Sequence, residues 1–416
     1  MAADSPLLQL PGMVGFRHRV DQALEEATAA DDELMAQMGG HLITAGGKRA
    51  RPLFTVASAA ALAADDAAID AAVTHEVVLG GVSVELVQVG SLCHDDVIDE
   101  AATRRGVESV NARWGNLKAI LAGDFLLAKA SEIAASLGTE VAGLLAATIG
   151  RLCEGEVHEL RRAYDVTRTE ASYYQAIEGK TAALFATACR VGGIVGELPR
   201  PTIDVLTEFG RRYGMAFQIV DDVLDVVATD AQLGKPAGHD IAEGIYNLPV
   251  LYALEELGPD LGTLLGGPID GADLDLARRL VHASKGVERS VDVARAHVED
   301  AVTALAPLGP TPAAIALGGA AGHLLLELEA VLQHAVGALC PALGRAQPQR
   351  RAALEPQRDR TLLAGVQVDA QRADESPAGA RAHVVRARRQ AAEGEAPVLL
   401  RIHHAPRDVG PARRPG

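Results

Sequence analysis

The sequence predicts an all-α protein, and three observations support that prediction. Alanine and leucine dominate the 416 residues, while aromatic residues make up only 3%, a composition that favours helices over sheets. Apolar residues recur at steps of three and four in residues 82–106, VSVELVQVGSLCHDDVIDEAATRRG, as they do on a buried helix. That stretch and residues 217–227, FQIVDDVLDVV, each carry three aspartates with the same spacing.

The bulk composition excludes several classes of function. The formal net charge of −16 argues against nonspecific binding of nucleic acid. The four cysteines are scattered without CxxC spacing, so neither a zinc site nor a disulfide framework is expected, and a reducing cytoplasm fits. The N-terminal MAADSPLLQLPG lacks the basic start and long apolar core of a signal peptide. No uninterrupted apolar run reaches membrane-spanning length.

The first half of the chain predicts helices joined by two charged segments. We expect an amphipathic helix over residues 16–38, a helix over 53–64 and an acidic loop over 65–70. Residues 41–52, HLITAGGKRARP, form a predicted turn with Lys48, Arg49 and Arg51. Taken alone it could be a solvated basic turn. Next to the aspartate clusters, a diphosphate site is favoured because guanidinium groups bind phosphate oxygens in pairs.

The first aspartate cluster consists of Asp95, Asp96 and Asp99. Residues four apart on a helix share a face, so Asp95 and Asp99 should point the same way, about 6 Å apart along the axis. Two carboxylates that close repel each other unless a cation intervenes. A site that supplies one or two carboxylate ligands and leaves room for phosphate oxygens suits Mg²⁺. Arg104 and Arg105, followed by a glycine, could pair with nearby acids or bind a second phosphate group.

The middle of the chain predicts three more helices. Residues 111–136 carry Asp124, which we interpret as a buried structural partner rather than a catalyst, and residues 141–162 carry three glutamates without an assigned role. Residues 170–191 place Lys180 and Thr181 in mid-helix, where the lysine either extends its ammonium group to solvent or serves a site at the edge of the core.

The second aspartate cluster consists of Asp221, Asp222 and Asp225, on a predicted helix over residues 202–228. One such cluster could be chance or helix capping. Two clusters contain six carboxylates, and burying them without counter-ions would cost roughly several kcal/mol per carboxylate. We therefore expect two facing clusters that hold two or three Mg²⁺ ions and a polyphosphate. Lys235 and Asp240 follow in a glycine-rich loop that could close over the phosphate. Helices resume at residue 248 and continue to about 336, with breaks near 258–271 and 306–312.

Six motifs in this order resemble those of the trans-polyprenyl diphosphate synthases, over about residues 15–335. A terpene cyclase would share one DDxxD but not the rest, and head-to-head synthases of the squalene type also lack this set. The motifs are GGKRARP (46–52), DDVID (95–99) followed by RRG (104–106), KT (180–181), FQ (217–218), DDVLD (221–225) and GK (234–235).

The resemblance implies an all-α, isoprenoid synthase-type helical bundle around a deep central cavity, formed by residues 1–338. It implies Mg²⁺-dependent condensation of isopentenyl diphosphate onto an allylic diphosphate, without a nucleophilic serine or cysteine. The metal ligands would be Asp95, Asp99, Asp221, Asp222 and Asp225, and Asp96 and Lys180 complete the catalytic set. The allylic diphosphate would be held by Arg104, Lys180, Thr181, Gln218 and Lys235, and isopentenyl diphosphate by Lys48, Arg51 and Arg105.

The family also suggests a homodimer. Some of its long-chain members work as heteromers, so a non-catalytic partner subunit is a second possibility. We favour a catalyst because this chain keeps both aspartate clusters.

Product length is expected to depend on the helical turns before Asp95. Bulky aromatics block the tunnel there in short-chain members of the family, whereas this chain carries Val87, Gly90 and Ser91. An open tunnel predicts a long product, about C30 to C50, of the kind used as a quinone side chain. The alternative is that these small residues only permit close helix packing and that the chain stops at C20.

The sequence departs from the family pattern at two positions. Gln88 stands where many long-chain members carry a histidine that contacts isopentenyl diphosphate, and glutamine can still donate a hydrogen bond there. Residues 245–247, IYN, replace a frequent Lys-x-Thr, which weakens the expectation of a cation at that point.

The C-terminal segment, residues 339–416, differs in composition from the rest. From Pro341 onward it carries 14 arginines, no lysine and eight acidic residues. Such a basic, proline-containing segment with little apolar periodicity predicts disorder. Arginine without lysine also suggests a frameshifted or extended terminus. A basic arm that touches an anionic membrane, where a long product must be delivered, is the functional alternative.

Overall fold

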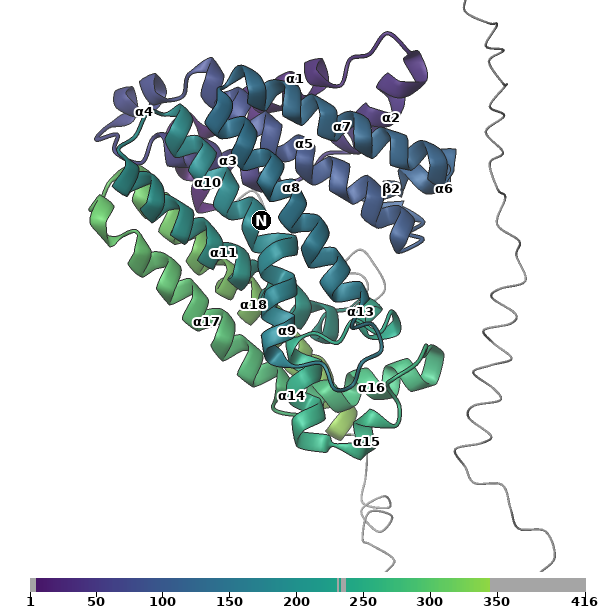
Figure 1. Cartoon of the computed structure of the whole chain (residues 1–416). Helices are drawn as coiled ribbons and strands as arrows, with labels where there is room; N and C mark the ends of the chain where they lie inside the picture. The colour runs from purple at the N-terminus through teal and green to yellow at the C-terminus, as the bar shows by residue number, and fades with distance from the viewer. Residues whose placement is uncertain (1–4, 230–231, 233–236, 345–416) are drawn as a thin grey trace, which may run out of the picture. The chain divides into compact units, whose positions relative to one another are not determined.

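The computed structural model describes residues 5–229, 232 and 237–344, with side chains up to residue 333. Figure 1 shows a bundle of helices in which α5 lies among α1, α3 and α7. The helices of the N-terminal half are α1 (Met13–Ala27), α2 (Glu33–Thr44), α3 (Ala50–Ala59), α4 (Asp66–Ala72), α5 (His75–Ile98), α6 (Val110–Trp114), α7 (Asn116–Ser136) and α8 (Thr139–Leu160), preceded by the 3₁₀ helix η1 (Pro6–Gln9).

The C-terminal half packs around α11, which contacts α10, α17 and α18. Its helices are α9 (Glu170–Ile177), α10 (Ala183–Val195), α11 (Arg200–Val227), α13 (His239–Ala242), α14 (Leu248–Leu257), α15 (Pro259–Gly262), α16 (Gly271–Ala283), α17 (Gly286–Ala304) and α18 (Pro312–Gly344), with the 3₁₀ helix η3 (Ala306–Leu308). Among the described residues, strands are limited to a hairpin of β1 (Thr103–Arg104) and β2 (Val107–Glu108). The all-α prediction is therefore confirmed, as are the predicted breaks between α14 and α16 and between α17 and α18.

Several local predictions were wrong. The single helix expected over residues 111–136 is split into α6 and α7 at Gly115, whose φ of 90° interrupts the helix. The single helix expected over residues 16–38 is split, because Asp32 caps α2 by accepting a 2.8 Å hydrogen bond from the Met35 amide. The acidic loop expected over 65–70 is α4, which Asp65 caps in the same way. The helix expected over 170–191 contains a π-helical turn, η2 (Glu178–Ala182), between α9 and α10. In each place a side-chain cap, a glycine with positive φ or a tertiary contact decides what apolar periodicity cannot.

Helix α5 is the centre of the N-terminal half. The side chain of Thr74 accepts a hydrogen bond from the Val77 amide and caps its start, and most of its residues are buried. By length and composition, α5 and Pro312–Gln333 of α18 could each cross a membrane, but 72% of the apolar window of α5 is buried within the protein. That burial is what a core helix requires, and it holds the aspartates at the end of α5 in a fixed position.

The predicted boundary at residue 338 falls inside α18, which continues to Gly344. The first compact unit of the chain runs to Ala346. The arginine-rich segment beyond Gly344 lies outside the described residues, so its interpretation as a disordered or extended terminus stays a prediction.

Candidate active site

The first aspartate cluster lies at the C-terminal end of α5, with Asp96 buried and Asp95 and Asp99 half-buried. Asp96 Oδ1 accepts a 2.6 Å hydrogen bond from Nε of Arg104, and Nη2 of the same guanidinium lies 2.6 Å from this oxygen in an ion pair. Asp96 also accepts a 2.9 Å bond from the Asn111 amide through its backbone carbonyl. Asp96 thus fixes the hairpin and places Arg104 next to the two other aspartates.

Burial and mutual repulsion raise the pKa values of the two half-buried aspartates. Burial raises the pKa of Asp95 to about 7; the charge of Lys180 opposes this, while Glu156 and Asp99 add to it. Burial and repulsion by Glu243 raise the pKa of Asp99 to about 6. Carboxylates crowded in this way are stabilised by a bound cation.

Lys180 lies between two glutamates of α8. Its Nζ is 2.8 Å from Glu156 Oε2 and 2.6 Å from Glu159 Oε2. Burial lowers the pKa of Lys180, but the two carboxylates outweigh this and raise it above the ordinary value, so the amine is charged at neutral pH. Sequence reasoning left both glutamates unassigned, although their spacing of three on one helix face was a readable signal.

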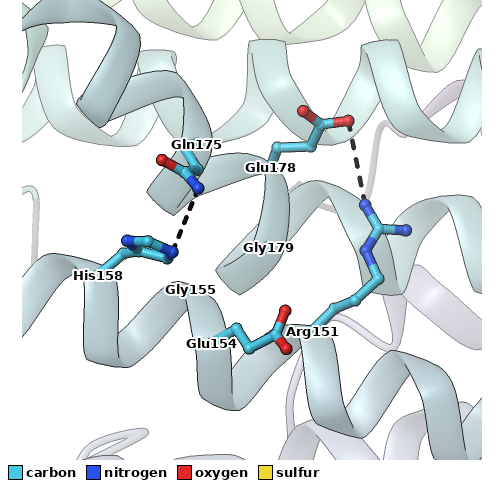
Figure 2. A pocket seen from close by; sticks show the side chains of 7 residues that line it. All are labelled: Arg151, Glu154, Gly155, His158, Gln175, Glu178 and Gly179. Atoms are coloured by element: carbon cyan, nitrogen blue, oxygen red, sulfur yellow. Dashed lines mark hydrogen bonds and ion pairs between the residues drawn. The ribbon is translucent and has the colours of Figure 1, made fainter.

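The π-helical turn that carries Lys180 is in backbone contact with α8. A Cβ at Gly155 would lie 2.4 Å from the Lys180 amide nitrogen, and one at Gly179 would lie 2.8 Å from the Arg151 carbonyl oxygen. Figure 2 shows these two glycines in a polar recess, which Arg151, Glu154, His158, Gln175 and Glu178 complete. None of the predicted site residues lines this recess. The contact between the glycines brings the Lys180 backbone close to α8.

Asp222 of the second cluster is buried, with 4% of its surface exposed, and both of its oxygens accept hydrogen bonds. Tyr173 Oη donates to Oδ2 at 2.6 Å and Gln218 Nε2 donates to Oδ1 at 2.8 Å. Thr181 Oγ1 in turn donates to Gln218 Oε1 at 2.6 Å. Burial raises the pKa of Asp222, and the two hydrogen bonds oppose that rise. A continuous network therefore joins the π-helical turn to α11, and sequence reasoning missed its member Tyr173.

The other two aspartates of this cluster have different surroundings. Asp221 is exposed, whereas Asp225 is 1% exposed and accepts a 3.3 Å hydrogen bond from the Asp240 amide. The Asp240 amide therefore brings the segment after α11 back onto that helix, but Asp240 lies in α13 and not in the expected loop. Its carboxylate accepts a 3.1 Å hydrogen bond from the Asn247 side chain. Lys235 lies outside the described residues.

The arrangement fits Mg²⁺ that is shared with a substrate. Within the ranges that the structure describes, no three Asp, Glu, His or Cys side chains converge closely enough to hold a metal ion by themselves. Mg²⁺ is commonly bound by one or two carboxylates together with phosphate oxygens and water. Asp95 and Asp99 lie one helical turn apart and provide two carboxylates of this kind.

The predicted cations of the basic turn have unequal surroundings. Arg51 packs its guanidinium 4.4 Å from the centroid of the Phe185 ring, and burial lowers its pKa to about 10. Its Nε has no hydrogen-bond partner among the described residues. Arg105 donates to the carbonyl oxygens of Leu42 and Gly46, both at 2.6 Å. Lys48 is exposed. A half-buried guanidinium with an unused donor is suited to bind an anion.

The residues proposed to set product length differ in what they face. A Cβ at Gly90 would lie 3.1 Å from the Gly123 carbonyl oxygen and 3.2 Å from Leu127 Cγ, so Gly90 packs against α7. Val87 is buried, and Ser91 is half-buried one turn before Asp95 on the same face of α5. The packing explanation fits Gly90, and Ser91 is better placed to face a growing chain. Gln88 is half-buried beside them.

The fold and the site together define an isoprenoid synthase: an all-helical bundle with two aspartate-rich helices and a charged lysine within electrostatic reach of Asp95. Residues 32–266 match the family model of polyprenyl synthetase. The chain belongs to this family and is a polyprenyl diphosphate synthase, an enzyme that transfers prenyl groups.

Two curated relatives and one solved structure are similar over most of their length. The chain is 40% identical to the nonaprenyl diphosphate synthase of Mycobacterium tuberculosis over 303 residues, 72% of this chain and 88% of that one. It is 36% identical to component 2 of the heptaprenyl diphosphate synthase of Geobacillus stearothermophilus, over 68% and 87% of the two chains. A polyprenyl synthase of Caulobacter crescentus, complexed with calcium and isoprenyl diphosphate, superimposes with a TM-score of 0.72 at 31% identity, over 77% and 96%.

Proposed function

We propose that this enzyme condenses isopentenyl diphosphate head-to-tail onto an allylic diphosphate to make a polyprenyl diphosphate of about C30 to C50, of the kind used as a quinone side chain. The observation that carries the proposal is Lys180, charged and held between Glu156 and Glu159 within electrostatic reach of the first aspartate cluster. The similarity to a nonaprenyl diphosphate synthase supports the long product.

The proposed reaction begins when the diphosphate group leaves the allylic substrate. Asp95, Asp99 and Asp221, assisted by Asp222 and Asp225, would hold two or three Mg²⁺ ions, which supply charge neutralisation for the leaving group. Lys180, Arg104 and Lys235 would bind the same diphosphate as it gains negative charge. Thr181 and Gln218, already joined by a hydrogen bond, would orient it. Asp96 would act by holding Arg104.

Isopentenyl diphosphate would bind at the basic turn through Lys48, Arg51 and Arg105, with Gln88 nearby. After the bond between the allylic carbon and the diphosphate oxygen has broken, the double bond of isopentenyl diphosphate attacks the allylic cation and forms the new carbon–carbon bond. The adjacent carbon then loses a proton to the departed diphosphate, which restores a double bond in the product. Arg51 supports this placement because it is half-buried and keeps an unused Nε–H. The attraction between these cations and the diphosphate is stronger where water is excluded.

A product assay tests the proposed function directly. Purified protein, full-length and truncated after Gly344, is supplied with Mg²⁺, labelled isopentenyl diphosphate and either farnesyl or geranylgeranyl diphosphate. We expect a ladder of products that ends at C30 or longer. A stop at C20 would keep the reaction and refute the long product. Absence of product from folded protein would indicate that a partner subunit is needed, as the name component 2 of one relative suggests for that enzyme.

Ser91→Phe should shorten the product. Ser91 lies on the face of α5 that carries Asp95, so a phenyl ring would project below the aspartates and block the chain. Chromatography of the products should show a maximum at least two isoprene units shorter. Gly90→Ala is the comparison, because its methyl group would press on α7, and we expect a lower melting temperature with little change in product length. Unchanged product length in Ser91→Phe would contradict the assignment.

We also propose that the enzyme is cytoplasmic and that it forms a homodimer through α7. Leu117, Ile120 and Leu121 on this helix are 74%, 41% and 47% exposed, and apolar side chains at this spacing form one unpartnered face. Light scattering of the purified protein would measure the mass. Contact of the C-terminal arginines with a membrane for product delivery remains a proposal that concerns residues outside the described part.

A further inference from the structure

Glu85 is a buried carboxylate that the proposed reaction leaves unused. It lies on α5 ten residues before Asp95, and only 3% of its surface is exposed. A buried carboxylate is costly unless cations or hydrogen-bond donors surround it. Its Oε1 lies 3.3 Å from Arg49 Nη1 and 3.5 Å from Arg105 Nη2. One carboxylate oxygen is therefore shared by two guanidinium groups from distant segments of the chain.

Arg49 is occupied by contacts within the protein. It begins α3 in a left-handed conformation, with φ of 50°, which a non-glycine residue adopts only when its surroundings hold it there. Besides Glu85, it donates to Asp21 at 2.8 Å, to the Ile43 carbonyl at 2.8 Å and to the Gly46 carbonyl at 3.1 Å. Four of its five N–H donors are thus used. Arg49 fixes the turn and has little capacity left for a ligand.

Arg51 and Arg105 keep more of their capacity for a ligand. Arg51 Nε is unused among the described residues, and Arg105 lies close enough to Arg51 and to Arg49 for mutual repulsion. Glu85 attracts both Arg51 and Arg105. Three guanidinium groups gathered around one turn repel each other, and Glu85 is the carboxylate that acts on all three. Asp21 contacts Arg49 from the outer side, with 36% of its side chain exposed.

We propose that Glu85 is a positioning residue for the isopentenyl diphosphate site: its buried carboxylate, in contact with Arg49 and Arg105, holds Arg105 in place near Arg51, so that the remaining donors of Arg105 and Arg51 converge on one diphosphate. The inference rests on the proposed assignment of Arg51 and Arg105 to that substrate. Removing Glu85 would let the two arginines separate, and the site would lose its fit to the diphosphate.

Glu85→Gln and Asp21→Asn form a matched pair, because each removes one carboxylate partner of Arg49 while only the first also affects Arg51 and Arg105. We expect Glu85→Gln to raise KM for isopentenyl diphosphate at least about tenfold, as for a lost charge-assisted contact. KM for farnesyl diphosphate should change less than about twofold. Asp21→Asn should leave both constants within about twofold. Circular dichroism melting reports whether each variant folds.

A second measurement separates this inference from the proposed function. Calorimetric titration with isopentenyl diphosphate alone needs no turnover, and we expect binding to the wild type and to Asp21→Asn but at least about tenfold weaker binding to Glu85→Gln. That outcome supports the role of Glu85 even if no product is made. Equal losses in both variants, or equal rises in KM for both substrates, would reduce Glu85 to a structural residue and overturn the proposal.

Glu85→Asp covers the case in which Glu85→Gln does not fold. Its side chain keeps the charge but is one methylene shorter, so it cannot contact Arg49 and Arg105 in the same geometry. We expect a smaller rise in KM that is still confined to isopentenyl diphosphate. A folded Glu85→Asp protein with unchanged KM for that substrate would refute the positioning role.

Discussion

Replacing Asp95 by alanine is expected to lower kcat by about 10³-fold while the protein stays folded. Asp95 supplies the half-buried carboxylate whose pKa is raised to about 7 by burial and by Glu156 and Asp99, which is the surrounding expected of a cation ligand. Loss of one group that stabilises the charge of a leaving diphosphate typically costs about 10²- to 10³-fold. Single-turnover assays over a range of Mg²⁺ concentrations would measure the loss and show whether excess metal restores activity.

Asp124→Ala is the control for this variant. Asp124 belongs to neither cluster. The prediction that it is buried was wrong, because it is 63% exposed on α7, where its carboxylate lies 3.4 Å from His94 Nε2. Activity within a few-fold of the wild type is expected. If Asp95→Ala kept more than a tenth of the activity, or if both variants fell equally, the first aspartate cluster would not carry the reaction.

Replacing Gly155 by alanine is expected to lower kcat by about 10²-fold, although Gly155 contacts no substrate. Its added Cβ would lie 2.4 Å from the Lys180 amide nitrogen and 2.9 Å from the Ala176 carbonyl oxygen. These are backbone atoms, so the π-helical turn itself must move. A displacement of about 1 Å in a catalytic group can cost about 10²-fold. The crowding should also destabilise the fold by about 1–3 kcal/mol. Steady-state kinetics and thermal melting would measure both effects.

Gly150→Ala is the matched control on the same helix. A Cβ at Gly150 meets nothing within 4 Å, so the substitution should stabilise α8 by about 0.5–1 kcal/mol and leave kcat unchanged. A Gly155→Ala enzyme with full activity would show that the position of the π-helical turn is not important. Equal losses in both variants would point to α8 as a whole.

The sequence predicted the aspartate helices well because their signal is local. Apolar periodicity and the i, i+4 spacing place Asp95 and Asp99 on one face of α5, and the structure confirms the helix. The same reasoning did not find Glu85 or Tyr173, because nothing in their immediate neighbours shows what they contact. Glu85 meets Arg49 and Arg105 across 36 and 20 residues of sequence, and Tyr173 meets Asp222 across 49.

The tertiary structure also changed the interpretation of residues that the sequence had grouped together. Lys48, Arg49 and Arg51 are neighbours in one turn, yet Arg49 uses four of its five donors in protein contacts, Arg51 is half-buried with an unused donor and Lys48 is exposed. Gly90 and Ser91 are adjacent, but Gly90 packs against α7. Which neighbour in the fold occupies each face of a helix is invisible to periodicity.

The sequence by itself determined the all-α class, the family motifs and the two aspartate clusters, since helix formation and residue spacing depend on contacts a few residues apart. Only the tertiary structure decided that Lys180 lies in a π-helical turn between Glu156 and Glu159, and that Gly155 and Gly179 allow this turn to touch α8. These features depend on how closely two helices approach, and that distance is set by packing between segments far apart in the chain.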